Sequence, residues 1–324
     1  MDQGARMTST ESFKHSQHSL VKSESRLGVK KNGQEGIGGL MVRVRIICGF
    51  TALMCLMAFQ PYANASSAEG LKHRGWIASM EMHKDLSALK KARTLFLEAQ
   101  KLDPNDADID YLIGFTYFKE GEFAFVREHD KAQAVKSYTT AAECAERGLK
   151  KDPNSVTCHF GRAASLARIL DANYGGKSIL RNVFSVGKIL PRLRVIEKDI
   201  DFVLTHFKRV KPPAEEGYDY AYLVTVIRAS LLWHFPGVLG GDKQKAEELL
   251  LEAHRRIPND PLPYCELARL YYKLEHDNQK AQVYCRKVLD WKNPYYLFDY
   301  EAFYKPQCEE ILGAVQQATA SAKR

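Results

Sequence analysis

Apolar residues recur at helical spacing along the chain from about residue 70, and no convincing alternating strand pattern is found there. The clearest unit lies at 236–258, where the glycine pair Gly240-Gly241 precedes Asp242, a good N-cap for a helix. One face of that helix carries small and apolar residues at steps of four and three: Ala246, Leu250 and Ala253. Pro258 follows and ends the helix. The unit therefore predicts a turn, a capped helix and a stop.

The same spacing, closed by a proline, occurs at two further places in the chain. The first copy consists of Ala92, Phe96, Ala99 and Pro104. The second consists of Ala141, Ala145, Gly148 and Pro153. The helices that pair with these units share a small residue three positions before a tyrosine, at Gly114 and Tyr117 and again at Ala268 and Tyr271. Small residues let paired helices approach closely, so the pattern predicts an all-α chain of helix-turn-helix repeats.

This pattern resembles the tetratricopeptide repeat family, in which a glycine and a tyrosine recur in one helix and a proline closes the next. The resemblance covers residues 86–118 and 238–290. It implies a tetratricopeptide-type solenoid, or α-α superhelix, that binds protein partners. Because one repeat cannot bury its apolar face alone, we expect the repeats to stack in one domain at 66–294, with a capping helix and tail at 295–324.

Between the two matching regions the repeat pattern changes. The surplus at 123–135 is expected to lengthen the helices of its repeat or to form a loop after a turn at Gly121. The later segments are predicted to be helices at 156–173, 178–190 and 193–209, a linker at 211–217 and a long apolar helix at 218–235.

Three segments of this middle region carry a second resemblance: Phe184 to Leu190, Leu232 to Phe235, and the turn from Pro236 to Asp242. With the helical pattern around them, over residues 156–275, they are similar to the T-component family associated with TRAP transporters, which are periplasmic repeat proteins. The resemblance implies a cavity or pore for a hydrophobic ligand, a homo-oligomer, and a solute-binding component of a transporter as partner. The lipoprotein cysteine usual in that family is missing here, so the resemblance does not extend to membrane tethering.

The N-terminal part of the chain has an export pattern. Residues 1–40 are polar without a hydrophobic period, and we expect them to be disordered or untranslated. Residues 41–65 have the three parts of a secretory signal, which are a basic start, an apolar run at 46–59 and the small-x-small site ending at Ala65. The apolar run is shorter than the roughly 20 residues of a membrane span. We therefore expect a Sec-type signal peptide cleaved near Ala65 and a periplasmic or otherwise exported mature chain.

Net charge gives little indication of a partner. Removing residues 1–65 removes half of the formal net charge of +8. Basic pairs such as Arg255-Arg256 fit helix ends, where the helix dipole favours cations. We therefore expect no nucleic-acid partner.

Five cysteines remain after removal of the signal peptide, and an odd number leaves at least one of them outside any intramolecular disulfide. Cys265 and Cys285 are predicted on the two antiparallel helices of one repeat, which makes them the best candidates for a disulfide. The alternative is that both are small buried apolar residues.

Patterns for catalysis and metal binding are missing from the sequence. The histidines form no HExxH motif, the serines lack the G-x-S-x-G context, and the cysteines lack zinc spacing. We therefore expect no enzyme activity, no cofactor and no metal.

Aromatic residues crowd the last third of the chain, and tyrosine and tryptophan are favoured at contact sites. Four of them are the candidates for a binding face on the concave side of the solenoid: Tyr220, Tyr222, Trp233 and Tyr264. Two functions follow. In the first, the chain is an accessory of a transport system that binds a partner protein or a hydrophobic small ligand. This hypothesis predicts a tunnel lined by apolar and aromatic side chains. In the second, the chain is an interaction scaffold in cell-envelope assembly, and this hypothesis predicts a polar groove without a cavity.

Overall fold

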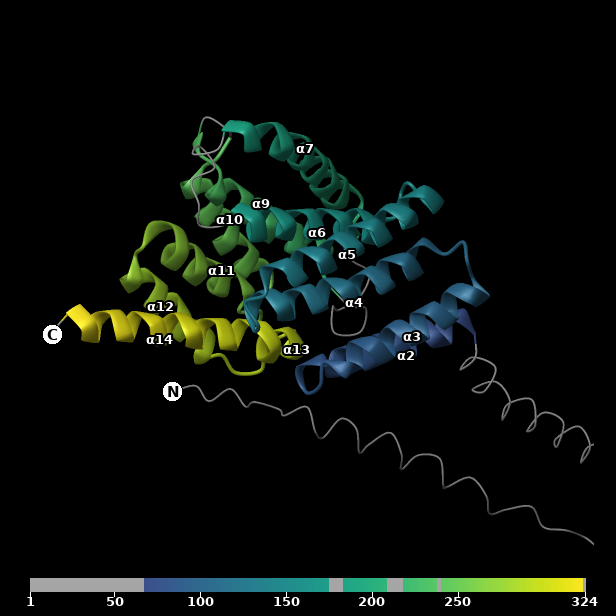
Figure 1. Cartoon of the computed structure of the whole chain (residues 1–324), viewed down its shortest axis with the longest axis horizontal. Coiled ribbons are helices and arrows are strands. Elements are labelled where there is room, and N and C mark those ends of the chain that lie inside the picture. The colour runs from purple at the N-terminus through teal and green to yellow at the C-terminus, as the bar shows by residue number, and fades with distance from the viewer. Residues whose placement is uncertain (1–66, 175–182, 209–217, 238–239, 323–324) are drawn as a thin grey trace, which may run out of the picture. The chain divides into compact units, whose positions relative to one another are not determined.

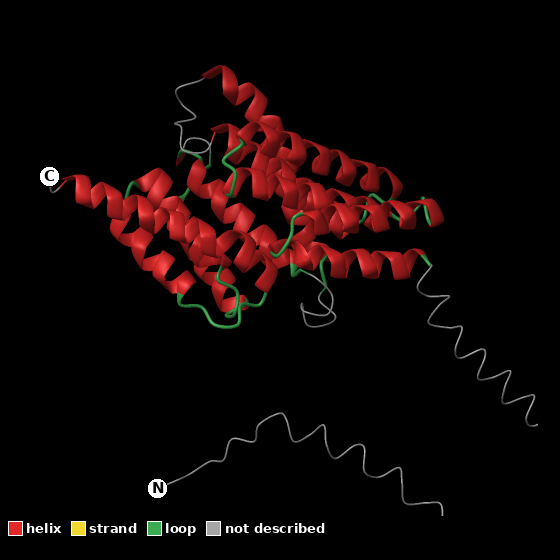
Figure 2. Cartoon of the chain, turned by 60° about the horizontal axis from the view of Figure 1, so that its bottom comes forward, coloured by secondary structure: helices red, strands yellow, loops and turns green. Residues whose placement is uncertain are grey.

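The computed structural model describes residues 67–174, 183–208, 218–237 and 240–322, all within the compact unit Pro61–Arg324. The predicted extension at 1–40, the signal peptide at 41–65 and the linker at 211–217 lie outside the described residues. Every regular element in the described ranges is helical, as Figure 1 and Figure 2 show.

The longer α-helices, in chain order, are α2 (Ala68–Met80), α3 (Ser87–Leu102), α4 (Ala107–Val126), α5 (Lys131–Lys151), α6 (Val156–Tyr174), α7 (Val183–His206), α9 (Tyr220–His234), α10 (Lys243–Arg256), α11 (Leu262–Leu270), α12 (Asn278–Leu289) and α14 (Lys305–Ala322). Short elements complete the chain: the 3-10 turn η1 (Glu81–His83), the π-helical turns η4 (Tyr271–Glu275) and η5 (Tyr300–Tyr304), and α13 (Leu297–Asp299).

Consecutive helices pack as pairs, namely α2 with α3, α4 with α5, α6 with α7, α9 with α10, and α11 with α12. Each pair also packs on the next one along the chain. The predicted all-α solenoid of helix-turn-helix repeats is therefore confirmed.

Aspartates begin many of these helices by capping them. The side chains of Asp106, Asp130, Asp219, Asp242 and Asp277 each accept a hydrogen bond from a backbone N–H of the first turn. Such a cap satisfies a backbone donor that has no partner within the helix, and it stabilises the helix by about 1 kcal/mol. The cap predicted at Asp242 is one of them, with Oδ1 at 2.9 Å from the Lys245 nitrogen.

The small residues of the repeat lie where paired helices cross. Ala92, Phe96, Ala99, Ala246, Leu250, Ala253 and Ala268 are all buried. A Cβ atom on Gly114 would lie 3.0 Å from the Cβ atom of Cys144 on α5. Tyr271 is buried against Trp233, as the repeat pattern predicts, whereas Tyr117 is half-buried with the Arg93 guanidinium 3.7 Å from its ring centre. Helices α3 and α10 end just before Pro104 and Pro258.

The turn before α10 depends on both of its glycines. Gly240 has a φ of +86°, a conformation that other residues rarely adopt. A Cβ atom on Gly241 would overlap the backbone oxygen of Phe235. The Asp242 nitrogen then donates to the Leu232 oxygen, so the turn packs directly against the end of α9.

Two predicted breaks in the chain are wrong. The turn expected at Gly121 is absent, because α4 continues through this residue to Val126 and the surplus at 123–135 lengthens the helices. Gly121 instead makes room for Tyr138, whose ring would lie 2.6 Å from an added Cβ atom. Likewise, the two helices expected on either side of Pro191 are one helix, α7, with this proline inside it.

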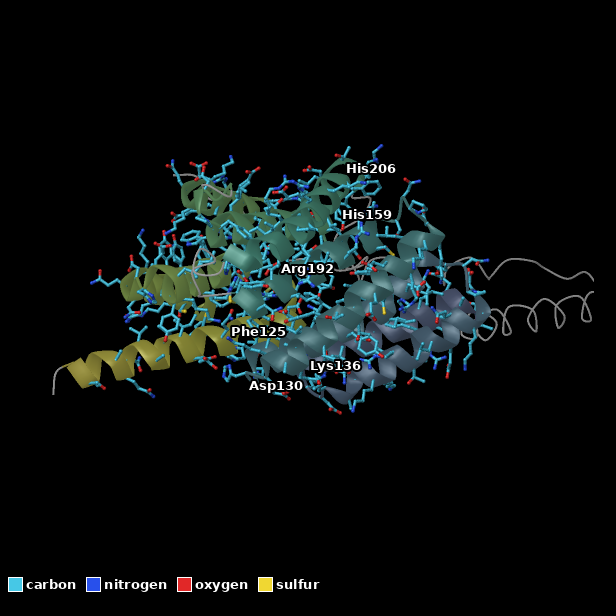
Figure 3. The ribbon with its side chains drawn as sticks, turned by 45° about the horizontal axis from the view of Figure 1, so that its top comes forward. Phe125, Asp130, Lys136, His159, Arg192 and His206 are labelled. Carbon is cyan, nitrogen blue, oxygen red and sulfur yellow. The ribbon has the colours of Figure 1, made fainter. Side chains whose placement is uncertain are left out.

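Helices α6 and α7 are joined by a buried charge group around Asp199. The Asp199 carboxylate accepts two hydrogen bonds from Arg162 and lies 2.6 Å from Nδ1 of His159. The ring of Phe202 stacks on His159 and on His206, and both histidines are labelled in Figure 3. This group fixes α7 although it lies in the most degenerate part of the repeat pattern.

The end of the chain returns to its first repeats. Helix α14 packs on α11 and α12, while α13 and η5 contact α4 and η1. The rings of Phe123 and Phe303 are 5.0 Å apart, and Nη1 of Arg127 donates to the backbone oxygen of Ala302. A simple solenoid has contacts only between neighbouring repeats, so these contacts close the stack across its length.

Candidate functional site

A pocket of about 150 Å³, which we call the central pocket, lies where the returning end of the chain meets the earlier helices. Its walls come from α4, α6, α9, α11 and the segment 299–304, whose helices can be followed in Figure 1. Most of the lining is apolar or aromatic: Phe115, Phe118, Phe160, Leu223, Ile227 and Phe303 are examples.

Each wall is one stripe of a helix. On α6 the lining residues stand at steps of three and four, from Phe160 through Ala164 and Ala167 to Asp171. On α9 the stripe runs from Leu223 to His234 in the same manner. Residues at these spacings share a helix face. Each stripe is apolar near its start and polar at its end, where Asp171 and His234 stand.

The polar end is a buried network centred on Asp171. Its carboxylate accepts hydrogen bonds from Arg168 of the same helix and from Arg269 of α11. Arg269 is 2% exposed and also donates to Glu266, at 2.7 Å, and to the hydroxyl of Ser230. The network thereby ties α6, α9 and α11 together at the pocket wall.

A neighbouring part of the network reaches the second repeat through Glu122. One carboxylate oxygen of Glu122 accepts from Arg168 at 2.7 Å, and the other accepts from the hydroxyl of Tyr138 at 2.6 Å. Burial and the adjacent Glu122 carboxylate both raise the pKa of Tyr138 well above its usual value, so the phenol stays a donor.

Charge pairing keeps the network ionised despite its burial. Burial alone would raise the pKa of Asp171, but Arg269 and the contact with His234 outweigh it and hold that pKa well below the ordinary value. The pKa of Glu266 is lowered in the same way, because Arg269 and Arg168 outweigh burial. These carboxylates are therefore anions at neutral pH, each already held by a guanidinium.

A second charge pair lines the pocket at the point of closure. Nζ of Lys119 lies 2.5 Å from one oxygen of Asp299, and the hydroxyl of Tyr218 donates to the other at 2.5 Å. Rings of Phe115, Phe303 and Tyr218 surround the ammonium group at 5.2 to 5.4 Å. The lysine is therefore satisfied by its neighbours.

The pocket contains a serine, a histidine and an aspartate, but not in the arrangement of a nucleophilic triad. The hydroxyl of Ser230 accepts from Arg269, at 3.1 Å. Nδ1 of His234 lies 2.7 Å from the backbone oxygen of Ser230, and Nε2 lies 3.4 Å from Asp171. Both ring nitrogens are thus engaged away from the serine hydroxyl, whereas a serine nucleophile would need one of them as its proton acceptor.

The four aromatic residues predicted as a binding face lie elsewhere. Tyr222 is 0% exposed and donates to Asp260, while Trp233 is 4% exposed and donates to Glu275. Tyr220 packs against Tyr111 and Phe160, and Tyr264 packs against His254 and Trp291. The prediction of one shared face is therefore wrong, because α9 is apolar on most sides and buries Tyr222 and Trp233 in the core.

The cysteines of the described residues are free thiols, and all five are buried. Cys265 and Cys285 lie on α11 and α12, as predicted, but Cys308 of α14 contacts both of them. The structure therefore has the alternative arrangement, in which they pack as small apolar residues, in place of the proposed disulfide.

The described part of the chain shows neither a candidate metal site nor a candidate membrane span. It contains no group of three or more histidine, cysteine, aspartate or glutamate residues able to hold a metal ion. It also contains no helix that is both long enough and apolar enough to cross a membrane.

A cavity was expected from the second resemblance, but its lining residues were not identified from the sequence, although one signal was available. Arg168 and Asp171 stand on the same stripe of α6 as Phe160 and Ala164, and Ser230 and His234 stand on the apolar stripe of α9. Charged residues on a stripe that otherwise points inward indicate a buried polar site.

No family model and no curated protein matches the chain. Among solved structures, the chain is similar to the crystal structure of a thermophilic TPR protein in Thermus thermophilus, with a TM-score of 0.44 and 17% identity over 78% of this chain and 100% of that one.

Proposed function

We propose that this chain is a non-catalytic helical-repeat protein that binds a small apolar ligand in the central pocket. The observation that carries the proposal is the pocket itself, about 150 Å³ with mostly apolar walls. An apolar cavity of about this size is enough to hold a molecule such as benzene. Pockets of this kind, with a few fixed polar groups, are the usual form of a small-molecule site.

The pocket also favours one of the two functions considered from the sequence. A pure interaction scaffold would need only its outer faces, whereas a ligand-binding accessory needs an apolar interior space. Service to a transport system, with a solute-binding component as partner and a homo-oligomer as the working form, is the finer part of this proposal. It is supported by the resemblance of residues 156–275, and the scaffold in cell-envelope assembly is the alternative.

The ligand proposal is tested by filling the pocket. Ala167 lines the pocket on α6, and Ala167→Leu adds a branched side chain there without loss of helix propensity. The matched control is Ala132→Leu, at an exposed position of α5. With benzyl alcohol as probe and calorimetry as readout, Ala167→Leu is expected to weaken binding about tenfold or more, and Ala132→Leu to leave it unchanged. Failure of the wild-type chain to bind, or equal binding by both variants, would overturn the proposal.

Export is a separate part of the proposal with its own test. Expression of the full chain in a bacterial host, followed by fractionation, is expected to place the protein in the periplasm with Ser66 as its first residue. Ala65→Asp at the cleavage site is expected to leave the precursor uncleaved, since signal cleavage requires a small residue there. A mature chain that retains residues 41–65 would contradict it.

A further inference from the structure

We infer that the central pocket selects an uncharged ligand and rejects an organic anion of the same size. The inference rests on the proposed function, since it concerns what the pocket holds. It comes from the charges of the walls and from the way in which each of them is already paired.

Charged groups of both signs lie in and around the pocket wall, with the His234 imidazole beside Asp171. The cations are Lys119, Arg168 and Arg269, and the carboxylates are Glu122, Asp171, Glu266 and Asp299. A site built for an anion needs a cation to spare, and each of these cations already has a carboxylate partner.

Every one of those cations is engaged by protein groups. Lys119 is held by Asp299 at 2.5 Å, and Arg168 by Glu122 at 2.7 Å. Arg269, which is 2% exposed, is held by Asp171 at 3.0 Å and by Glu266 at 2.7 Å. A ligand carboxylate would have to displace one of these carboxylates and leave it buried without its cation. The free-energy cost of that unpaired charge is larger than the free energy gained from the new ion pair.

A cationic ligand is disfavoured as well, because the carboxylates it would need are already hydrogen-bonded. Both oxygens of Glu122 and both oxygens of Asp299 already accept hydrogen bonds within the protein. A ligand ammonium beside either of these two residues would lose its water shell and gain no carboxylate oxygen that is not already in use.

An uncharged polar group, in contrast, has a place in the wall. The hydroxyl of Ser230 accepts a hydrogen bond from Arg269 and keeps its own proton to donate. Around it the stripe of α9 is apolar, with Ile227 and Leu231 lining the pocket. The ligand class is therefore a small ring or short alkyl body that carries at most one neutral polar group, such as a hydroxyl or a carbonyl.

Three probes of nearly equal size test the inference with the purified full chain: benzyl alcohol, benzoate and benzylammonium. At about pH 7.5 the second and third are fully ionised. Calorimetric titration is expected to show benzyl alcohol binding at least about tenfold more tightly than either ion.

A variant pair assigns the selectivity to the wall charges. Glu266→Gln removes one carboxylate of the wall, while its amide oxygen can still accept from Arg269, which also keeps Asp171. It is expected to shift the ratio of benzoate affinity to benzyl alcohol affinity about tenfold in favour of benzoate. Glu248→Gln, at an exposed position of α10, is the matched control and is expected to change neither.

The outcomes separate this inference from the proposed function. If benzoate or benzylammonium binds as tightly as benzyl alcohol, the inference is overturned while ligand binding stands. If Glu266→Gln leaves the ratio of benzoate affinity to benzyl alcohol affinity unchanged, the assignment to the wall charges is overturned. If none of the three probes binds, the proposed function itself fails.

Discussion

Lys119 on α4 and Asp299 on α13 are separated by 180 positions in the chain, and their side chains meet at 2.5 Å in the wall of the central pocket. Both are buried, with 8% and 2% of their side chains exposed. The pair lies where the end of the chain returns to the second repeat. The same ion pair therefore holds the end of the chain against α4 and forms part of the pocket wall.

Breaking this pair is expected to destabilise the fold strongly. Asp299→Leu leaves a buried ammonium without its carboxylate, which costs about 3–5 kcal/mol of unfolding free energy. The double variant Lys119→Met/Asp299→Leu is expected to be more stable than Asp299→Leu, since no buried charge remains. Urea unfolding measures both. The exposed pair of Lys245 and Glu248 is the control, and Lys245→Met should cost less than about 1 kcal/mol. An Asp299→Leu variant of wild-type stability would contradict the closure argument.

Asp260 is expected to make stability fall as pH rises. Burial raises its pKa to about 7, although the Leu262 N–H and the Tyr222 hydroxyl donate to it. Between about pH 4 and 7 the folded protein keeps a proton that the unfolded chain has released, so the free energy of unfolding falls by up to about 4 kcal/mol. Asp260→Asn mimics the protonated acid and should remove this part of the pH dependence in urea unfolding.

A control aspartate separates this effect from the general titration of the protein. Asp290 is exposed at the end of α12, and Asp290→Asn should leave the pH dependence as it is in the wild type. If Asp260→Asn falls in stability over the same pH range as the wild type, the buried carboxyl is not its cause.

Two helical glycines should respond oppositely to alanine. In α4, a Cβ atom on Gly121 would lie 2.6 Å from the ring of Tyr138, which is fully buried and held by Glu122. Gly121→Ala is therefore expected to cost about 1–3 kcal/mol through overpacking. Gly313 in α14 has no atom within 4 Å of such a Cβ, so Gly313→Ala should stabilise by up to about 1 kcal/mol. Thermal unfolding of both variants checks the signs, and stabilisation by Gly121→Ala would contradict the packing.

The repeat architecture was predictable because its signals are local. Ala92, Ala246 and Asp242 act within one turn of helix or between two helices that are neighbours in the chain, so their spacing is visible in the sequence. The central pocket was not predictable in this way. It depends on Lys119 meeting Asp299 and on Asp171 meeting Arg269, contacts between distant segments that no local period records.

The aromatic residues were also misassigned, because their exposure depends on contacts between distant helices. Tyr222 and Trp233 have the composition of a contact site, yet both are in the core because α9 is covered by neighbours from several repeats. Residue type alone does not tell which side of such a helix is left open. The charged residues on apolar stripes were the better signal, since burying a charge requires partners that must come from other helices.

The cysteines of the last repeat are expected to be slow to react in the folded protein. Contacts with Cys265 and Cys285, together with burial, raise the pKa of Cys308 far above its usual value. The thiolate is the reactive form, so neither alkylation nor oxidation should proceed readily while α14 stays packed on α11 and α12. Treatment of the native protein with iodoacetamide, followed by peptide mapping, should leave the peptides of these three cysteines unmodified.

The same reagent in denaturant tests the disulfide considered from the sequence. Unfolding without a reductant should expose all five thiols of the described residues, and each of their peptides should then be alkylated. A Cys265–Cys285 disulfide would leave both of their peptides unmodified until a reductant is added. Cys308→Ala should still give alkylation at Cys265 and Cys285, because these two are buried thiols independently of their contact with α14. Protection of this pair in denaturant would therefore show that the protein carries the bond, in contrast to the free thiols of the structure.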